Sequence, residues 1–175
     1  AKAGEQVILF VCDAEDAYWQ IPLCPVERRF FCGMLRLPSG QTKYVCYMRT
    51  PQGSRGAPLA WSVVFGLINR CVLGVLRDPV VPNSTCLEVY VDDPAMAQCG
   101  TPEVCTEQVA LAVIAWLVLG VRLATGKGQL GPVVSWIGAE FRVSSWAVVA
   151  KILEARLTEL LDLVEATRGQ RLASV

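Results

Sequence analysis

The 175-residue chain contains no histidine. This absence excludes a Ser-His-Asp triad, a Cys-His protease, a His-ligated zinc site and every proton transfer that needs an imidazole. Any chemistry that the chain performs must therefore use carboxylates, hydroxyls, amines or a hard metal ion held by oxygen ligands.

Charged residues are also scarce: they make up 18% of the chain, against roughly 25% in an ordinary soluble domain. Hydrophobic residues make up 53%, and this balance excludes an intrinsically disordered chain. It also suggests surfaces that another part of a protein covers.

The longest uninterrupted apolar run, residues 109–121, has 13 residues. A membrane span needs about 20, so we expect a buried helix there and no contact with a membrane. No charged and then apolar leader opens the sequence, which predicts an intracellular protein, cytoplasmic or nuclear, without a secretory signal. Because the chain begins with Ala rather than Met, we also expect it to be a piece of a longer protein.

Cysteine, by contrast, is plentiful. An even number of cysteines suits the disulfide framework of a small secreted domain, but here most lie in apolar, strand-like or helical stretches and no C-x-x-C spacing occurs. We therefore expect buried, reduced cysteines in an intracellular protein. The eight are Cys12, Cys24, Cys32, Cys46, Cys71, Cys86, Cys99 and Cys105.

Basic and acidic residues balance at sixteen each but are segregated along the chain. Residues 28–77 carry eight Lys or Arg and no acid, whereas residues 78–121 carry six acids and no Lys or Arg. This pattern predicts a cationic region that meets phosphate beside an anionic locus that holds cations, unless the fold interleaves the two blocks in space.

Hydrophobic periodicity predicts short strands mixed with longer helices. A turn signal at residues 38–41 joins two strands into a hairpin, and Thr101 followed by Pro102 begins the second helix. This order favours an α+β domain in which an antiparallel sheet carries its helices on one face. The expected strands lie within residues 6–12, 30–37, 42–49, 86–91, 95–98, 121–123 and 133–143, and the expected helices are residues 57–76, 101–119 and 151–167.

Three separated segments place polar residues at the ends of these elements. Asp13 ends the first strand in DAEDAYWQIPL (13–23), TPQGSRGAP (50–58) precedes the long helix, and YVDD (90–93) lies at a hairpin tip. In this order and at these spacings, they resemble the palm of a reverse transcriptase of the retroelement type.

Two fainter segments agree. GVRL (120–123) followed by Lys127 is similar to the family's segment after the second palm helix, and VSWIG (134–138) is similar to its primer-grip hairpin. The resemblance covers about residues 7–141.

The resemblance implies a polymerase palm, whose core is ferredoxin-like or RRM-like. The palm would span residues 1–143, with a fingers-side hairpin at about 30–49 and a primer-grip-like hairpin at about 133–143. Residues 144–175 would form the connection and the start of a thumb helix.

The implied function is that of an RNA-directed DNA polymerase of a retrotransposon, a nucleotidyltransferase that joins a dNTP to a primer 3′-hydroxyl on an RNA or DNA template. Its fingers and thumb, with or without an RNase H region, would lie elsewhere in a longer polyprotein, and the resemblance leaves open whether the isolated fragment is active. The alternative is a decayed or domesticated palm that keeps the fold and binds nucleic acid without catalysis. A third candidate, a nucleotide cyclase with a palm fold, is disfavoured by the Pro-Gln-Gly loop and the primer-grip resemblance.

Nucleotidyl transfer depends on two divalent ions roughly 4 Å apart, and Mg²⁺ demands hard oxygen ligands that converge from different strands. By resemblance, Asp13 and Asp92 form the metal-chelating pair with the Ala14 backbone carbonyl, and Asp93 is the third catalytic carboxylate. Lys127 matches the lysine that protonates pyrophosphate. The expected cofactors are two Mg²⁺ ions, which Mn²⁺ can replace. Without a cation, at least one of the carboxyl pKa values should be raised.

The resemblance assigns the incoming dNTP to Asp16, Ala17, Tyr18, Gln52 and Gly53. Tyr18 matches the aromatic residue that packs under the ribose and excludes a 2′-hydroxyl, and Gln52 matches the residue that contacts the sugar and base. The structural alternatives are core packing of Tyr18 beside Trp19 and an ordinary loop before a helix at Gln52.

Two further sets are assigned to the nucleic acid. The phosphate contacts are Arg28, Arg29 and Arg55, and the primer grip is Trp136, Ile137 and Gly138. Pro94 departs from the family pattern, in which a bulky apolar residue follows the paired aspartates. Because proline lacks a backbone donor, it alters the hairpin beside Asp93.

Overall fold

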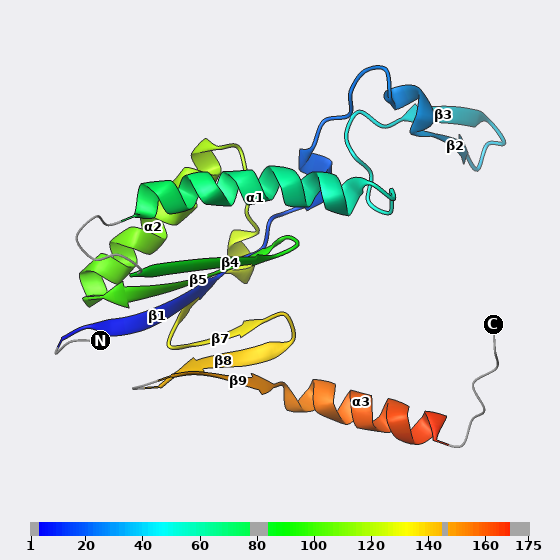
Figure 1. The fold of residues 1–175 in the computed structure, drawn as a ribbon. Coiled ribbons are helices and arrows are strands. Elements are labelled where there is room, and N and C mark those ends of the chain that lie inside the picture. The colour runs from blue at the N-terminus through cyan, green and yellow to red at the C-terminus, as the bar shows by residue number, and fades with distance from the viewer. Residues whose placement is uncertain (1–3, 78–83, 145–146, 169–175) are drawn as a thin grey trace.

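The computed structural model describes residues 4–77, 84–144 and 147–168. In these residues, two helices cover one face of an antiparallel sheet, while a hairpin and a C-terminal helix extend from the body as two arms (Figure 1). The α+β class and the antiparallel sheet that the sequence predicts are confirmed.

The central sheet has the strand order β4-β5-β1-β6, and every neighbouring pair is antiparallel. β1 lies inside the sheet between β5 and β6, and its last three residues are buried in core clusters on the two faces. Its last residue, Val11, pairs with Ala95 of β5. The C-terminal end of β1 therefore lies beside the tip of the β4–β5 hairpin. The strands are β1 (Gln6–Val11), β4 (Thr85–Tyr90), β5 (Asp93–Gly100) and β6 (Gln129–Gly131).

The helices α1 (Ala57–Leu76) and α2 (Pro102–Val118) pack on this sheet. The Thr101 side chain accepts a hydrogen bond from the Val104 N–H at 3.4 Å, and Pro102 occupies the first helical position, as the sequence predicts. Between the helices, the buried Trp116 indole donates to the Asn69 side-chain oxygen at 2.8 Å.

α1 has the length and composition of a membrane span, with 20 residues and a mean hydropathy of 1.8 over its most apolar stretch. A core helix has the same properties. In α1, Trp61, Phe65 and Val72 are buried in the core that the sheet and α2 complete. The expectation of a buried helix at residues 109–121 is confirmed for one face of α2 only: Val109 and Trp116 are in the same core, whereas Val118 is 79% exposed.

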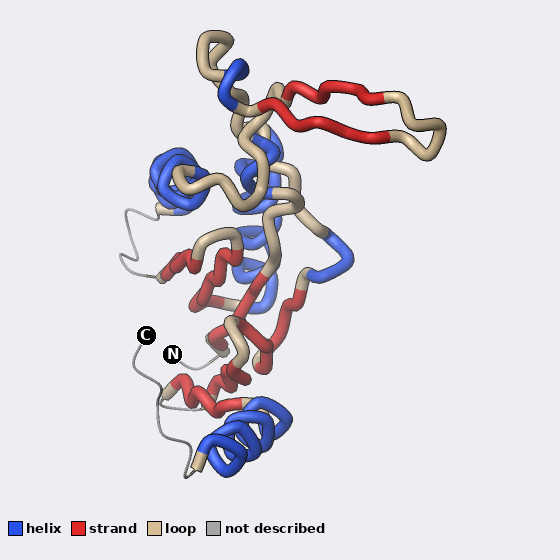
Figure 2. The backbone as a smooth tube through the Cα atoms, turned by 90° about the vertical axis from the view of Figure 1, so that its right-hand side faces the viewer, coloured by secondary structure: helices blue, strands red, loops and turns tan. Residues whose placement is uncertain are grey.

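The two arms are β2–β3 and α3. Figure 2 shows the β2–β3 hairpin projecting beyond the helices at one end and α3 at the opposite end. β7, β8 and β9 form a separate antiparallel sheet between the body and α3. The bounds are β2 (Cys32–Arg36), β3 (Thr42–Cys46), β7 (Val133–Trp136), β8 (Ala139–Val143), β9 (Val148–Ile152) and α3 (Glu154–Thr167).

Short 3-10 helices lie at three connections that the sequence analysis treats as loops or strands. They are η1 (Ala17–Gln20), η2 (Arg28–Phe30) and η3 (Thr125–Lys127). The predicted strand at residues 121–123 is wrong: only Leu123 makes a strand-like bridge, to Ala14, and the strand that pairs with β1 is β6 instead.

The C-terminal helix begins later than predicted. Residues 148–152 form β9, which pairs with β8, because Val148, Val149 and Ile152 are β-branched and favour a strand. Helix α3 starts at Glu154 rather than at Lys151, and its apolar residues, among them Leu160, are exposed.

The expectation of buried cysteines is wrong for most of them. Only Cys12 and Cys105 are buried and Cys99 is half-buried. For Cys32 and Cys46 the error arises because these strand residues lie in an arm that has no core of its own. The exposed cysteines are Cys24, Cys32, Cys46, Cys71 and Cys86.

Candidate functional site

The backbone brings Asp13 directly opposite Asp93. On either side of this pair, the chain after β1 is hydrogen-bonded to β5 and the hairpin tip: the Cys12 N–H donates to the Pro94 carbonyl at 3.2 Å, and the Ala14 N–H donates to the Asp92 carbonyl at 2.9 Å. A residue pair between two such bonds has its side chains on the same face of the sheet and close together. The register therefore sets two carboxylates beside each other.

Pro94 lacks a backbone N–H, and its position opposite Cys12 tolerates this lack. Its carbonyl and its ring nitrogen face the same neighbour, Cys12, and only the carbonyl can bond to it. Cys12 lies one residue beyond β1, so the ladder inside the sheet is intact. The Pro94 side chain is fully buried.

The tip of the β4–β5 hairpin is strained. Tyr90 pairs with Asp93, so the two residues between them form the turn, and Val91 has φ of 56°. A positive φ at the first turn position favours glycine, and a β-branched residue there is an outlier. Trp61 of α1, 1% exposed, stabilises this conformation by donating its indole N–H to the Val91 carbonyl at 2.8 Å.

A pocket of about 210 Å³ opens at this tip. It collects residues from four separate segments: the chain after β1, the loop before α1, the hairpin tip and η3. Eight of its nine lining residues are residues that the sequence analysis assigns to the site, and the ninth is Trp19. They are Asp13, Ala14, Asp16, Ala17, Tyr18, Trp19, Gln52, Asp92 and Lys127.

Tyr18 lies where the pocket meets the core, and its role toward a nucleotide stays a prediction. It lines the pocket with Gln52, and it is also half-buried against the hydrophobic core. Trp19 contacts Tyr47 instead, with 5.6 Å between ring centroids. Tyr18 therefore packs against the core and also borders the pocket.

A second pocket, of about 200 Å³, lies on the other side of Asp13. Asp13, Asp93 and Lys127 border it together with the predicted primer-grip residues Trp136 and Ile137. The Trp136 indole N–H donates to the Asp93 carbonyl at 3.0 Å. The β7–β8 hairpin is therefore attached directly to the backbone of a predicted catalytic carboxylate.

The electrostatics are those of crowded carboxylates. Burial, followed by the charges of Asp92 and Asp13, raises the pKa of Asp93, and Lys127 partly offsets this rise. Lys127 forms an ion pair with Asp13, and that hydrogen bond raises the pKa of Lys127. The prediction that one carboxyl pKa is raised is confirmed in direction for Asp93. Burial, with smaller effects of Asp13 and Asp93, also raises the pKa of Cys12 to about 12, so this thiol stays protonated.

Asp13, Asp92 and Asp93 provide the hard oxygens that Mg²⁺ or Mn²⁺ prefers, and the raised pKa of Asp93 marks negative charge that a cation would neutralise. The donor set therefore fits a divalent ion. Within residues 4–77, 84–144 and 147–168, however, no three Cys, Asp or Glu side chains are already grouped closely enough to hold a metal. The Lys127 ammonium instead lies on Asp13. The metal site, including the Ala14 carbonyl, stays a prediction.

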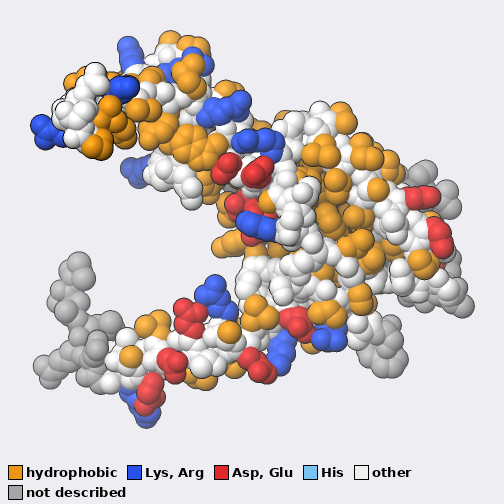
Figure 3. Space-filling view, turned by 180° about the vertical axis from the view of Figure 1, so that it is seen from behind, with side chains coloured by type: hydrophobic (Ala, Val, Ile, Leu, Met, Phe, Trp, Pro, Cys, Tyr) orange, Lys and Arg blue, Asp and Glu red, His pale blue; other side chains and the backbone are white. Residues whose placement is uncertain are grey.

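The predicted phosphate contacts do not line either pocket. Arg28 and Arg29 lie on η2 in the arm, where Arg28 donates to the Leu23 carbonyl at 3.3 Å and Arg29 lies 4.7 Å above the Phe30 ring. Arg55 is exposed in the loop before α1. Figure 3 shows a hollow between the two arms, with acidic and basic side chains at its base and further Lys and Arg side chains on the hairpin arm.

The remaining predicted residues are two glycines at turns. Gly53 has φ of 87° and Gly138 has φ of 81°, values that favour glycine, and both are exposed. Ile137, at 45°, precedes Gly138 in the β7–β8 turn, which gives this hairpin two consecutive residues of positive φ. Such a turn matches the twist of the strands that it joins.

Residues that position the site were missed by the sequence analysis. Besides Trp61, the Gln20 side chain bonds the Glu15 carbonyl at 2.7 Å and the Arg122 N–H at 2.9 Å, which ties the segment after Asp13 to the chain near η3. Arg49 donates to the carbonyls of Trp19 and Gln20. No sequence pattern marks these contacts, because all but the Gln20–Glu15 bond join residues that are far apart in the chain.

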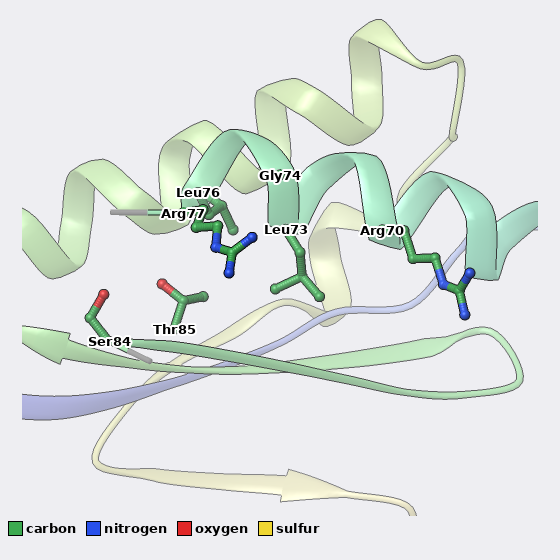
Figure 4. Close-up of a pocket in the computed structure, with 7 residues that line it drawn as sticks. All are labelled: Arg70, Leu73, Gly74, Leu76, Arg77, Ser84 and Thr85. Atoms are coloured by element: carbon green, nitrogen blue, oxygen red, sulfur yellow. The ribbon is translucent and has the colours of Figure 1, made fainter. Parts of the chain in front are cut away.

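A larger pocket of about 330 Å³ lies away from the carboxylates, between the C-terminal end of α1 and the start of β4 (Figure 4). Arg77 and Thr85 face each other across it, and Arg70 lies further along α1. Residues 78–83, which connect its two sides, lie outside the described residues. None of the predicted site residues borders this pocket.

Comparison with models of known protein families gives no match, and a search of curated proteins finds no relative.

Proposed function

We propose that the chain is the palm core of an RNA-directed DNA polymerase, which transfers a nucleotide from a dNTP to a primer 3′-hydroxyl. One observation carries the proposal: Asp13, Tyr18, Gln52, Asp92 and Lys127, chosen from three motifs and a fainter segment of the sequence, line a single pocket. These residues are up to 114 positions apart in the chain, and they come from the segments that the resemblance selects.

Each residue then has a task that suits its position. Asp13 and Asp92 would hold divalent ions, which when bound lower the pKa of the 3′-hydroxyl and neutralise charge on the leaving pyrophosphate. The Tyr18 ring, supported by the core, would limit the space under the sugar, and the exposed Gln52 amide would contact the sugar and base. Lys127 would move from Asp13 to the pyrophosphate and donate a proton to it.

The second pocket supports a place for the primer end. The Trp136 bond to the Asp93 carbonyl fixes the β7–β8 hairpin beside the carboxylates. The hollow between the β2–β3 arm and the α3 arm, which has acidic and basic side chains at its base, would hold the duplex (Figure 3). Cationic side chains of residues 28–55 would contact its phosphates, a sequence-independent interaction that salt weakens.

The test uses the chain itself with Mn²⁺ and a dNTP. The wild type should bind Mn²⁺, measured as loss of the free-ion signal in electron paramagnetic resonance, and Mn²⁺ with dNTP should raise the melting temperature. Asp92→Asn should lose both responses, whereas the matched control Asp162→Asn, an exposed aspartate of α3, should keep them. Equal responses of the two variants would refute the proposal.

The absence of a ready-made three-ligand cluster among the described residues favours one alternative, a palm that binds nucleic acid without catalysis. In that case the wild type would show no Mn²⁺ response but would still bind a primer–template duplex in a salt-dependent way. Arg28→Ala and Arg55→Ala should each then reduce the log–log salt slope by about one. Unchanged slopes would refute the role of these arginines under either function.

A further inference from the structure

Cys32 and Cys46 lie opposite each other in the β2–β3 hairpin. The Tyr47 N–H donates to the Phe31 carbonyl at 2.9 Å, so the adjacent pair is joined by a backbone hydrogen bond. Because hydrogen-bonded and non-bonded pairs alternate along antiparallel strands, the cysteines occupy a non-bonded pair. At such a pair the Cα atoms are about 4.5 Å apart and the side chains lie on the same face.

The two thiols converge on one atom. The Sγ of Cys32 and the Sγ of Cys46 each donate to the Arg28 carbonyl, both at 3.4 Å. The side-chain hydrogen bond between the two thiols is also the main cause that raises the pKa of Cys32. The sulfur atoms are therefore neighbours and have no other residue between them.

We propose that Cys32 and Cys46 form a reversible disulfide by exchange with a small-molecule disulfide such as glutathione disulfide. The Cα separation expected at a non-bonded pair falls within the range that a disulfide spans, roughly 4.4–6.8 Å. Both residues are exposed, so the oxidant can reach them. This inference concerns the arm and does not rest on the proposed polymerase function.

The exchange is balanced without any other reactant. The thiolate of one cysteine attacks a sulfur of glutathione disulfide, which forms a mixed disulfide and releases one glutathione thiolate. The thiolate of the second cysteine attacks the protein sulfur of that mixed disulfide, which closes the Cys32–Cys46 bond and releases the second glutathione. Two cysteines are oxidised, one glutathione disulfide is reduced, and the two thiol protons end on the glutathiones.

The pairing is selective among the cysteines of the described strands. Cys86 is also exposed and also lies in a strand, but the residue opposite it is Ala97. Cys99 lies opposite Val7. The closed bond would join the two strands at the base of the arm, next to η2, which carries Arg28 and Arg29. Oxidation would thus lock β2 to β3 and would remove both thiol hydrogen bonds to the Arg28 carbonyl, because a disulfide has no S–H donor.

The experiment equilibrates the full chain in mixtures of reduced and oxidised glutathione, blocks the remaining thiols, and digests the protein with trypsin without reduction. Arg36 and Lys43 lie between the two cysteines, so the bond leaves residues 30–36 linked to residues 44–49. Mass spectrometry should find this linked pair as the main cross-link at oxidising ratios. Cys46→Ser should abolish it and leave glutathione on Cys32, and the matched control Cys86→Ser should retain it.

Two results would overturn the inference. One is glutathione attached separately to Cys32 and Cys46 in the wild type. The other is free thiols at both positions under conditions where Cys86 has reacted. A repeat in urea distinguishes the effect of the fold: the selectivity for this pair should be lost when the register of β2 and β3 is lost.

Discussion

Replacing Trp61 by Phe should separate the support of the hairpin tip from the stability of the core. The indole N–H of Trp61 is bonded to the Val91 carbonyl, and its ring stacks on Phe65 with 4.7 Å between centroids. Leaving a buried carbonyl without its donor costs about 1–3 kcal/mol. The smaller ring leaves a cavity of ~40 Å³, which adds ~1 kcal/mol. The free energy of unfolding should therefore fall by about 2–4 kcal/mol.

The assay is urea unfolding followed by the Mn²⁺–dNTP melting shift, with Trp116→Phe as the matched control. Trp116 is equally buried and also donates its indole N–H, but to Asn69 between the helices, away from the site. Both variants should lose similar stability. Only Trp61→Phe should also weaken the ligand response, because only the Trp61 bond fixes the backbone of the turn that contains Asp92. A loss below about 1 kcal/mol, or an equal effect of both variants on the ligand response, would refute the reasoning.

Three further predictions concern the carboxylates and the pocket. The pKa of Asp93 is raised in the folded state, so the deprotonated carboxylate opposes folding at a pH above that value. Asp93→Asn should therefore raise the free energy of unfolding at neutral pH, and urea unfolding should show this gain shrinking as the pH falls through the raised pKa. Lys127→Met removes the charge that lowers the pKa of Asp93, so titration by nuclear magnetic resonance should find a higher Asp93 pKa, and an unchanged value would contradict the ion-pair geometry. In a chain joined to fingers and thumb, Tyr18→Ala should raise the incorporation of ribonucleotides relative to deoxyribonucleotides in primer extension. If wild type and variant discriminate equally between the two sugars, Tyr18 is a packing residue only.

Elements with strong local signals were predicted well. The bounds of α1 agree with the expected 57–76, because an apolar helical repeat fills that segment between a Gly-rich loop and residue 77. The hairpin at β2–β3 was predicted from its Pro-Ser-Gly turn. β6 was missed because Gln129, Leu130 and Gly131 have no strand pattern of their own; they form a strand by pairing with β1.

The candidate site was predicted through the resemblance rather than from local patterns. The pocket brings the named residues together, but their spacing along the chain contains no information about distances in space. What the motifs could not supply are the contacts that fix the geometry, such as Gln20 to Arg122 and Trp61 to Val91. These depend on how η1 and α1 pack, which is set by the whole core.

Pro94 gives the sheet a place where it can open at low cost. The Cys12 N–H donates to the Pro94 carbonyl, but Pro94 has no N–H to donate in return, so this pair has one backbone hydrogen bond where antiparallel strands ordinarily have two. The end of β1 nearest Asp13 can therefore separate from β5 without the separation spreading to Val11 and beyond. Amide hydrogen exchange at Cys12 should accordingly be faster than at the interior of β1. The spacing of the carboxylates can then adjust to a ligand while the rest of the sheet keeps its register.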